Sequence, residues 1–193
     1  MSAEDRSEQE KTKNAQKKVT IPAIKKTLKT YDKDALISMM LDCYRMSGDV
    51  KNYIHILMNP EETIEELYEK SKSLILQEFF PQRGIAKLKL SNAKKAISDF
   101  GKFSDDEVKI LDLMIYYVEL GVEFTNMYGD IDENFYSSIE KMYKNALKNI
   151  QSNQALSKQF NDRLKDIVDN ARGIGWGFYD YLAGCYYEYM EEI

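Results

Sequence analysis

The stretch EVKILDLMIYYVELGVEFTNMYG, residues 107–129, decides the fold class. Its apolar residues recur around most of the circumference of a helix, and a helix that is apolar on all sides is usually buried by its neighbours. Asp112 and Glu119 interrupt the stretch, so it lacks the roughly 18 consecutive apolar residues that a membrane span needs. We therefore expect residues 107–128 to form the central helix of a protein without a membrane segment.

The remaining sequence shows helical periodicity on both sides of this segment. The chain contains only 9 Gly and 3 Pro, and this scarcity of helix-breaking residues favours helices over strands. Apolar spacing, capping residues and turns predict further helices at about 21–31, 33–46, 50–58, 61–80, 92–100, 135–150, 156–171 and 176–192. We predict an all-α fold, a single compact bundle of about seven to nine antiparallel helices.

The domain organisation follows from a change in composition near residue 19. Residues 1–18 contain no aromatic and no β-branched aliphatic residue, so we predict a disordered tail there. Residues 19–193 are predicted to form a single helical domain, in which residues 19–60 make an N-terminal subregion of short helices.

The charge and the cysteine content restrict the functions that the protein can have. The net charge is −5 and the pI is about 5.1, an acidic balance that disfavours nonspecific binding to nucleic acid. Cys43 and Cys185 match no metal or redox spacing, and we expect two buried, reduced thiols. The N-terminal sequence has no apolar signal-peptide core. These features favour a cytoplasmic protein.

The stretch GIGWGFYDYLAGCYYEYM, residues 173–190, raises the question of a phosphate-binding loop. Such loops follow a strand, whereas a predicted helix precedes these glycines, and the spacing is G-x-G-x-G without the P-loop lysine. We predict instead that Gly173 ends one helix and that Gly175 and Gly177 let another backbone approach closely. Trp176 and Tyr179 then share one face of the last helix, a pattern more typical of a core than of a cofactor site.

A second unusual stretch, EFTNMYGDIDENFY, covers residues 123–136. Its Asp-x-Asp-x-Asn spacing resembles a calcium loop, but Phe135 stands where that loop needs Gly and Lys141 where it needs Glu. The stretch is better explained as a turn with capping residues between two helices. Glu119, Glu123 and Asn126 share one helix face, so a carboxylate pocket for a metal or a basic ligand stays open as an alternative.

No residue set indicates a particular reaction. His55 is the only histidine, and we expect it at the surface. We found no nucleophile elbow, zinc-protease, CxxC or P-loop motif in the sequence. We predict no catalytic residue, no metal and no cofactor, although paired carboxylates need no contiguous motif and an enzyme that uses them stays an alternative.

Segregated charge leads to the functional hypotheses. Residues 104–140 contain ten acids and one cation, Lys109, whereas residues 17–30 contain five lysines and no acid. Our first hypothesis is a non-catalytic protein-interaction module with an acidic, tyrosine-rich surface made of Glu123, Asn126, Asp130, Asp132, Trp176, Tyr179 and Asp180. A carboxylate-based enzyme at the same place is the second. The third is nucleic-acid binding through Lys25, Lys26, Lys29, Lys94 and Lys95. We expect a protein partner, rather than nucleic acid or a membrane.

Several segments together resemble a known family. They are VTIPAIKKTLKTYDKDALISMMLDCY, KAISDF, GVEFTNMYGDIDENFYSSIEKM and GIGWGFYDYLAGCYYEY. In these segments the chain resembles an uncharacterised bacterial family, a domain of unknown function. The resemblance implies a small, cytoplasmic, all-helical protein. It implies no activity, so no catalytic residue is transferred.

Overall fold

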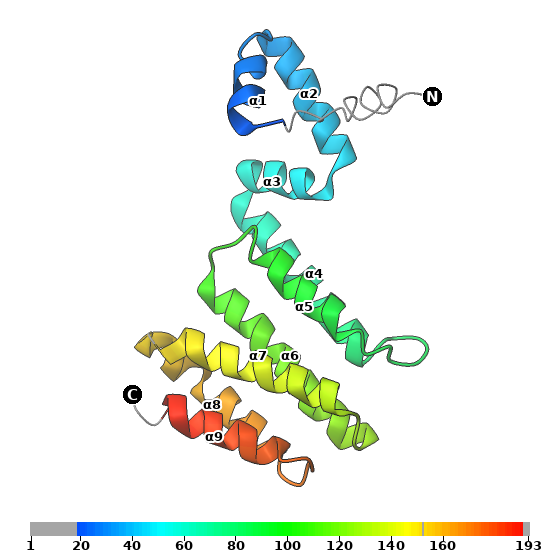
Figure 1. Ribbon diagram of the computed structural model, residues 1–193, viewed down its shortest axis with the longest axis vertical. Coiled ribbons are helices and arrows are strands. Elements are labelled where there is room, and N and C mark those ends of the chain that lie inside the picture. Colours follow the sequence, from blue (N-terminus) through cyan, green and yellow to red (C-terminus); the bar gives the residue numbers. More distant parts are fainter. Residues whose placement is uncertain (1–18, 152, 191–193) are drawn as a thin grey trace, which may run out of the picture. The chain divides into compact units, whose positions relative to one another are not determined.

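The computed structural model describes residues 19–151 and 153–190, and this part of the chain is helical without a strand (Figure 1). The helices are α1 (Ile21–Leu28), α2 (Lys33–Met46), α3 (Gly48–Met58), α4 (Pro60–Phe79), α5 (Leu90–Phe100), α6 (Glu107–Tyr128), α7 (Glu133–Gln151), α8 (Gln154–Asn170) and α9 (Phe178–Met190). The predicted all-α fold of seven to nine helices is confirmed. The predicted disorder at residues 1–18 falls outside the described residues.

Contacts within the chain divide it into two units. The first ends at Lys51 and the second runs from Asn52, so the boundary falls inside α3. The single domain predicted from the sequence, with a subregion of short helices that reaches residue 60, stays a prediction.

The first unit contains α1 and α2, and each helix has a side-chain cap at its N-terminus. Asp32 directly precedes the predicted helix at 33–46, a position that predicts an N-cap. Its Oδ1 accepts a hydrogen bond from the backbone N–H of Ala35 at 2.7 Å, which confirms that cap of α2. Neither helix contains a fully buried residue. Cys43 is exposed, so the prediction that both thiols are buried is wrong for this one. Cys43 shares this exposure with most of α2, in which no residue is fully buried.

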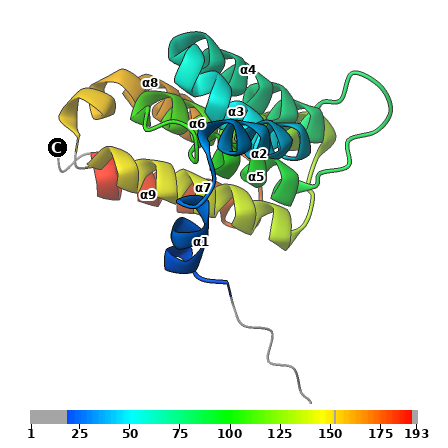
Figure 2. The ribbon, with the colours of Figure 1, turned by 90° about the horizontal axis from the view of Figure 1, so that it is seen from above.

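The second unit is built around α6. This helix contacts α4, α5, α7 and α8, while α9 packs on α7 and α8 (Figures 1 and 2). The buried residues of α6 are Leu111, Leu113, Met114, Ile115, Tyr117, Val118, Leu120, Gly121, Val122, Phe124 and Thr125. The expectation that α6 is the central helix is therefore confirmed for this unit.

Aromatic side chains and satisfied hydroxyls fill the core of the second unit. The ring centroid of Phe79 lies 5.5 Å from that of Tyr117 and 6.3 Å from that of Phe135, and both pairs pack edge to face. The buried hydroxyl of Tyr117 lies 2.8 Å from Ser138 Oγ, and that of Tyr143 donates to the carbonyl of Leu164 at 2.9 Å. Because both phenols find partners, the core accommodates them without an unsatisfied polar group.

The loop between α8 and α9 differs from its prediction. Gly173 has a φ of +87° just after α8 and ends that helix as expected. Trp176, predicted on a core-facing helix face, instead lies in the loop with a φ of +62° and is 73% exposed. Gly177 has a φ of +73°, and a Cβ there would meet nothing within 4 Å. This glycine therefore serves a left-handed turn, not the close helix approach that we had expected.

Candidate functional site

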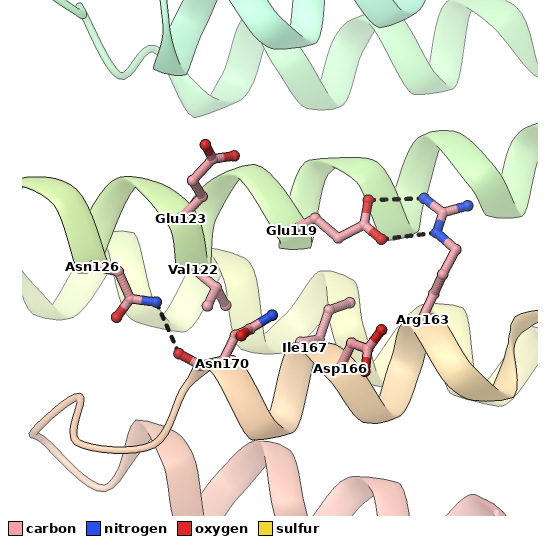
Figure 3. A pocket seen from close by; sticks show the side chains of 8 residues that line it. All are labelled: Glu119, Val122, Glu123, Asn126, Arg163, Asp166, Ile167 and Asn170. Carbon is pink, nitrogen blue, oxygen red and sulfur yellow. Dashed lines mark hydrogen bonds and ion pairs between the residues drawn. The ribbon is translucent and has the colours of Figure 1, made fainter.

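An open pocket lies between α6 and α8 in the second unit (Figure 3). Its volume is about 430 Å³. The lining side chains are mostly polar: Glu119, Val122, Glu123, Asn126, Arg163, Asp166, Ile167 and Asn170. In both helices the lining residues recur three or four positions apart, which places them on one helix face. The pocket is thus a direct consequence of two facing helices with matched periodicity.

Arg163 is held firmly at one end of this pocket. Its Nε and Nη2 atoms donate to the two carboxylate oxygens of Glu119, both at 2.8 Å, which is the bidentate geometry of the stronger ion pairs (Figure 3). Its Nη1 donates to Asp112 Oδ1 at 2.5 Å, and the hydroxyl of Tyr68 donates to Asp112 Oδ2. This chain of bonds connects α4, α6 and α8.

The titration of these groups reflects the same contacts. The hydrogen bond to Glu119 raises the pKa of Arg163 above its ordinary value, although burial acts in the opposite direction. Burial, and after it the hydrogen bond to Asp112, raises the pKa of the Tyr68 hydroxyl well above its usual range. Arg163 therefore stays charged and Tyr68 stays neutral at physiological pH.

Two carboxylates of the pocket have no cationic partner. Glu123 and Asp166 form no ion pair with any residue in the described part of the chain. Both are exposed, and Figure 3 shows the Glu123 side chain directed away from α8. Counting Glu119 and Arg163, the lining carries three negative charges against one positive charge. The pocket is therefore acidic, and its one cation, Arg163, is already paired with Glu119 and Asp112.

At its other end the pocket meets the loop before α9. Asn126 Nδ2 donates to the backbone carbonyl of Asn170 at 2.8 Å, which joins the ends of α6 and α8. A Cβ built on Gly175 would lie 3.9 Å from Asp130 Oδ2. The ring centroids of Tyr136 and Phe178 are 5.0 Å apart. The segments 123–136 and 173–180 thus lie next to each other in space.

The structure divides the seven predicted surface residues into groups. Glu123 and Asn126 line the pocket. Asp130 lies beside the loop and accepts a hydrogen bond from the hydroxyl of Tyr136 at 3.0 Å. Asp132 caps α7 by accepting the N–H of Phe135 at 2.9 Å. The others follow in the loop and the first turn of α9: Trp176 and Asp180, which are exposed, and Tyr179, which is half-buried.

Six further lining residues were absent from the predicted site: the polar Glu119, Arg163, Asp166 and Asn170, and the apolar Val122 and Ile167. Glu119 had a sequence signal, since it shares a helix face with Glu123 and Asn126. Arg163 had none, because only the packing of α8 against α6 brings it to that face. Of the acids on which the enzyme hypothesis rests, Glu123 lines this pocket, whereas Asp130, Asp132 and Asp180 do not. That hypothesis stays a prediction.

The predicted lysines lie in different units. Lys25, Lys26 and Lys29 are exposed at and just after α1. Lys94 Nζ donates to Ser138 Oγ at 3.0 Å, and Lys95 is ion-paired with Asp99 in the same helix. Binding of nucleic acid through these lysines stays a prediction.

The described residues hold neither a cluster suited to a metal ion nor a membrane-spanning helix. Within residues 19–151 and 153–190, no three His, Cys, Asp or Glu side chains are grouped closely enough to hold a metal ion. In the same ranges no helix combines the length and the apolar character needed to cross a bilayer.

Comparison with known proteins identifies the family. A family model described as "Family of unknown function (DUF6155)" matches residues 20–182. No curated protein and no solved structure matches the chain. The resemblance inferred from the sequence, to a family of unknown function, is confirmed. Because the match covers most of its length, the chain belongs to the DUF6155 family.

Proposed function

We propose that the chain is a non-catalytic interaction module that binds a basic segment of a partner protein at the pocket between α6 and α8. The observation that carries this proposal is the charge of the lining. Glu123 and Asp166 lack a cation in the described chain, and the guanidinium of Arg163 is already bound by Glu119 and Asp112. A lysine or arginine of a partner would supply the missing positive charge.

The apolar part of the pocket suits the same ligand. Val122 and Ile167 line it between the polar side chains. Lysine and arginine lay their methylene stems on apolar surface while keeping the charged head near water and carboxylates. A basic side chain therefore fits both components of the lining, whereas a small inorganic cation would use only the carboxylates.

The neighbouring loop offers a second point of contact. Trp176 is 73% exposed, and Tyr128 at the end of α6 is 62% exposed. Exposed tryptophan and tyrosine are the residues most often found at the energetic centre of protein interfaces. These side chains support the aromatic component of the predicted acidic, tyrosine-rich surface.

Cellular context belongs to the same proposal. The free thiols of Cys43 and Cys185 agree with a reducing compartment, and we retain the cytoplasm and a bacterial origin as predictions. A carboxylate-based enzyme and a nucleic-acid-binding protein remain the alternatives.

A peptide array tests the proposal. The full chain is applied to immobilised short peptides of varied composition, and the bound peptides should be enriched in lysine and arginine. Reversing one pocket charge in Glu123→Lys or Asp166→Lys should weaken binding at least about tenfold, because a like charge would then face the ligand. Added salt should weaken the wild-type interaction as well.

The control is Asp105→Lys, which makes the same charge change at an exposed residue before α6. It should bind nearly as the wild type does. Binding without preference for basic peptides, or equal losses in all three variants, would contradict the proposed pocket.

A further inference from the structure

A second surface lies on α2, in the first unit. Asp34, Ile37, Leu41 and Arg45 follow one another at intervals of three, four and four residues, so they form a single stripe along the helix. Ile37 and Leu41 are each 47% exposed, and both charged ends of the stripe are exposed as well. The stripe has an apolar centre, an acid at its start and a base at its end.

This stripe is complementary to itself when it is reversed. If a second α2 runs antiparallel to the first, with a twofold axis near the middle of the helix, Asp34 faces Arg45 of the second copy. Ile37 then faces Leu41, and the reciprocal pairs follow by symmetry. This is the isologous arrangement of most homodimers, in which the same patch serves both subunits.

The charges alone do not demand a partner. Asp34 lies in the first turn and Arg45 in the last turn of α2, where the helix dipole favours an anion and a cation respectively. Arg45 also pairs with Asp42 at 2.9 Å, but both side chains are more than 60% exposed, so exchanging that partner costs little. The isoleucine and leucine between the charges are what a partner would cover.

The overall charge of α2 favours a second copy over an anionic surface. The helix carries two cations, Lys33 and Arg45, and two anions, Asp34 and Asp42. A membrane or nucleic acid would select a basic face, whereas α2 places opposite charges at opposite ends. We propose that the chain self-associates through α2 as an antiparallel, twofold-symmetric dimer.

Such a stripe is short, so the association should be weak and should depend on concentration. Sedimentation velocity of the full chain over a concentration series tests it. The apparent mass should rise from the 22.5 kDa of one chain toward twice that value. Asp34→Arg or Arg45→Asp alone should weaken the association about tenfold, because each places two pairs of like charges across the axis.

The double variant Asp34→Arg/Arg45→Asp is the decisive measurement. It restores opposite charges across the axis and should recover association close to the wild type. Both substitutions oppose the helix dipole, so a merely weakened helix would make the double variant worse than either single variant. Circular dichroism of the same samples reports the helix content directly.

Ile37→Asp should abolish the association, since it places two anions in the apolar centre. Met46→Asp is the matched control, because Met46 is 87% exposed on a different side of the same helix, and this variant should associate as the wild type does. A chain that is monomeric at every concentration would overturn the proposal. So would an association that the charge reversals leave unchanged, or one that the double variant fails to restore.

Discussion

The helices α6 and α2 are both rich in apolar residues, yet they use them in opposite ways. Eleven residues of α6 are buried, whereas α2 has no fully buried residue. The difference lies in their surroundings, because α6 is in contact with four other helices of its unit. An apolar sequence thus stabilises the fold only where neighbours cover it. Elsewhere it leaves a surface available for association.

The largest expected effect contrasts one isoleucine from each helix. Ile115 in α6 is fully buried, so Ile115→Ala should lower the free energy of unfolding by about 2–5 kcal/mol through lost burial and a residual cavity. Ile37 in α2 is 47% exposed, and Ile37→Ala should cost less than about 1 kcal/mol, since alanine also favours a helix. Urea denaturation of dilute protein, followed by circular dichroism, measures both values.

Dilution is essential in this experiment because it keeps α2 unpaired. A similar loss in the two variants would mean that Ile37 is as deeply covered in solution as Ile115. The contrast between the helices would then be wrong.

A second test uses alkaline pH to probe the α6 core. Burial raises the pKa of the Tyr117 hydroxyl to about 12, from about 10 in an unfolded chain. The stability that this implies is fully present below pH 10 and is lost as pH rises toward 12. As pH rises from 10 to 12, the free energy of unfolding should therefore fall in both proteins, but by about 2–3 kcal/mol less in Tyr117→Phe than in the wild type.

The matching control is Tyr187→Phe, which alters a tyrosine that is 55% exposed. Its stability should fall with pH as that of the wild type does, because this substitution leaves the buried Tyr117 in place. Identical pH profiles for Tyr117→Phe and the wild type would show that Tyr117 ionises without opposing the fold.

The sequence predicted the fold wherever local rules decide the structure. Apolar residues around most of the helix circumference at 107–128 indicated a central helix, and Asp32 and Gly173 marked helix ends that the structure confirms. Trp176 was misplaced because an aromatic at helical spacing from Tyr179 fits the pattern of a continued helix. The left-handed φ of Trp176 depends on the turn as a whole, and spacing alone does not reveal it.

The candidate site was predicted only in part, for a related reason. Glu123 and Asn126 could be placed on one face of α6, since helical periodicity fixes that relation. Arg163 and Asp166 reach the same pocket only because α8 packs against α6. Periodicity within one helix carries no information about which face of a distant helix it will meet, so this half of the pocket could not be foreseen.

The smallest expected effect concerns two helical glycines and tests how tightly α6 is enclosed. A Cβ on Gly121 would lie 2.8 Å from Cγ1 of Ile139 in α7 and still closer to its Cδ1, whereas a Cβ on Gly184 in α9 would meet nothing within 4 Å. Ile139 is fully buried and has little room to move. Gly121→Ala should therefore lower the free energy of unfolding by about 1–2 kcal/mol, because the cost of overpacking exceeds the gain from the higher helix propensity of alanine.

Gly184→Ala should instead raise the free energy of unfolding by about 0.5–1 kcal/mol, because alanine loses less chain entropy than glycine when a helix forms. The opposite signs make the pair informative, since the two variants share one chemical change and differ only in their surroundings. Urea denaturation of both variants gives the comparison directly. A gain in stability at Gly121 would mean that α7 can withdraw from α6, and the close packing that distinguishes α6 from α2 would then not hold along its whole length.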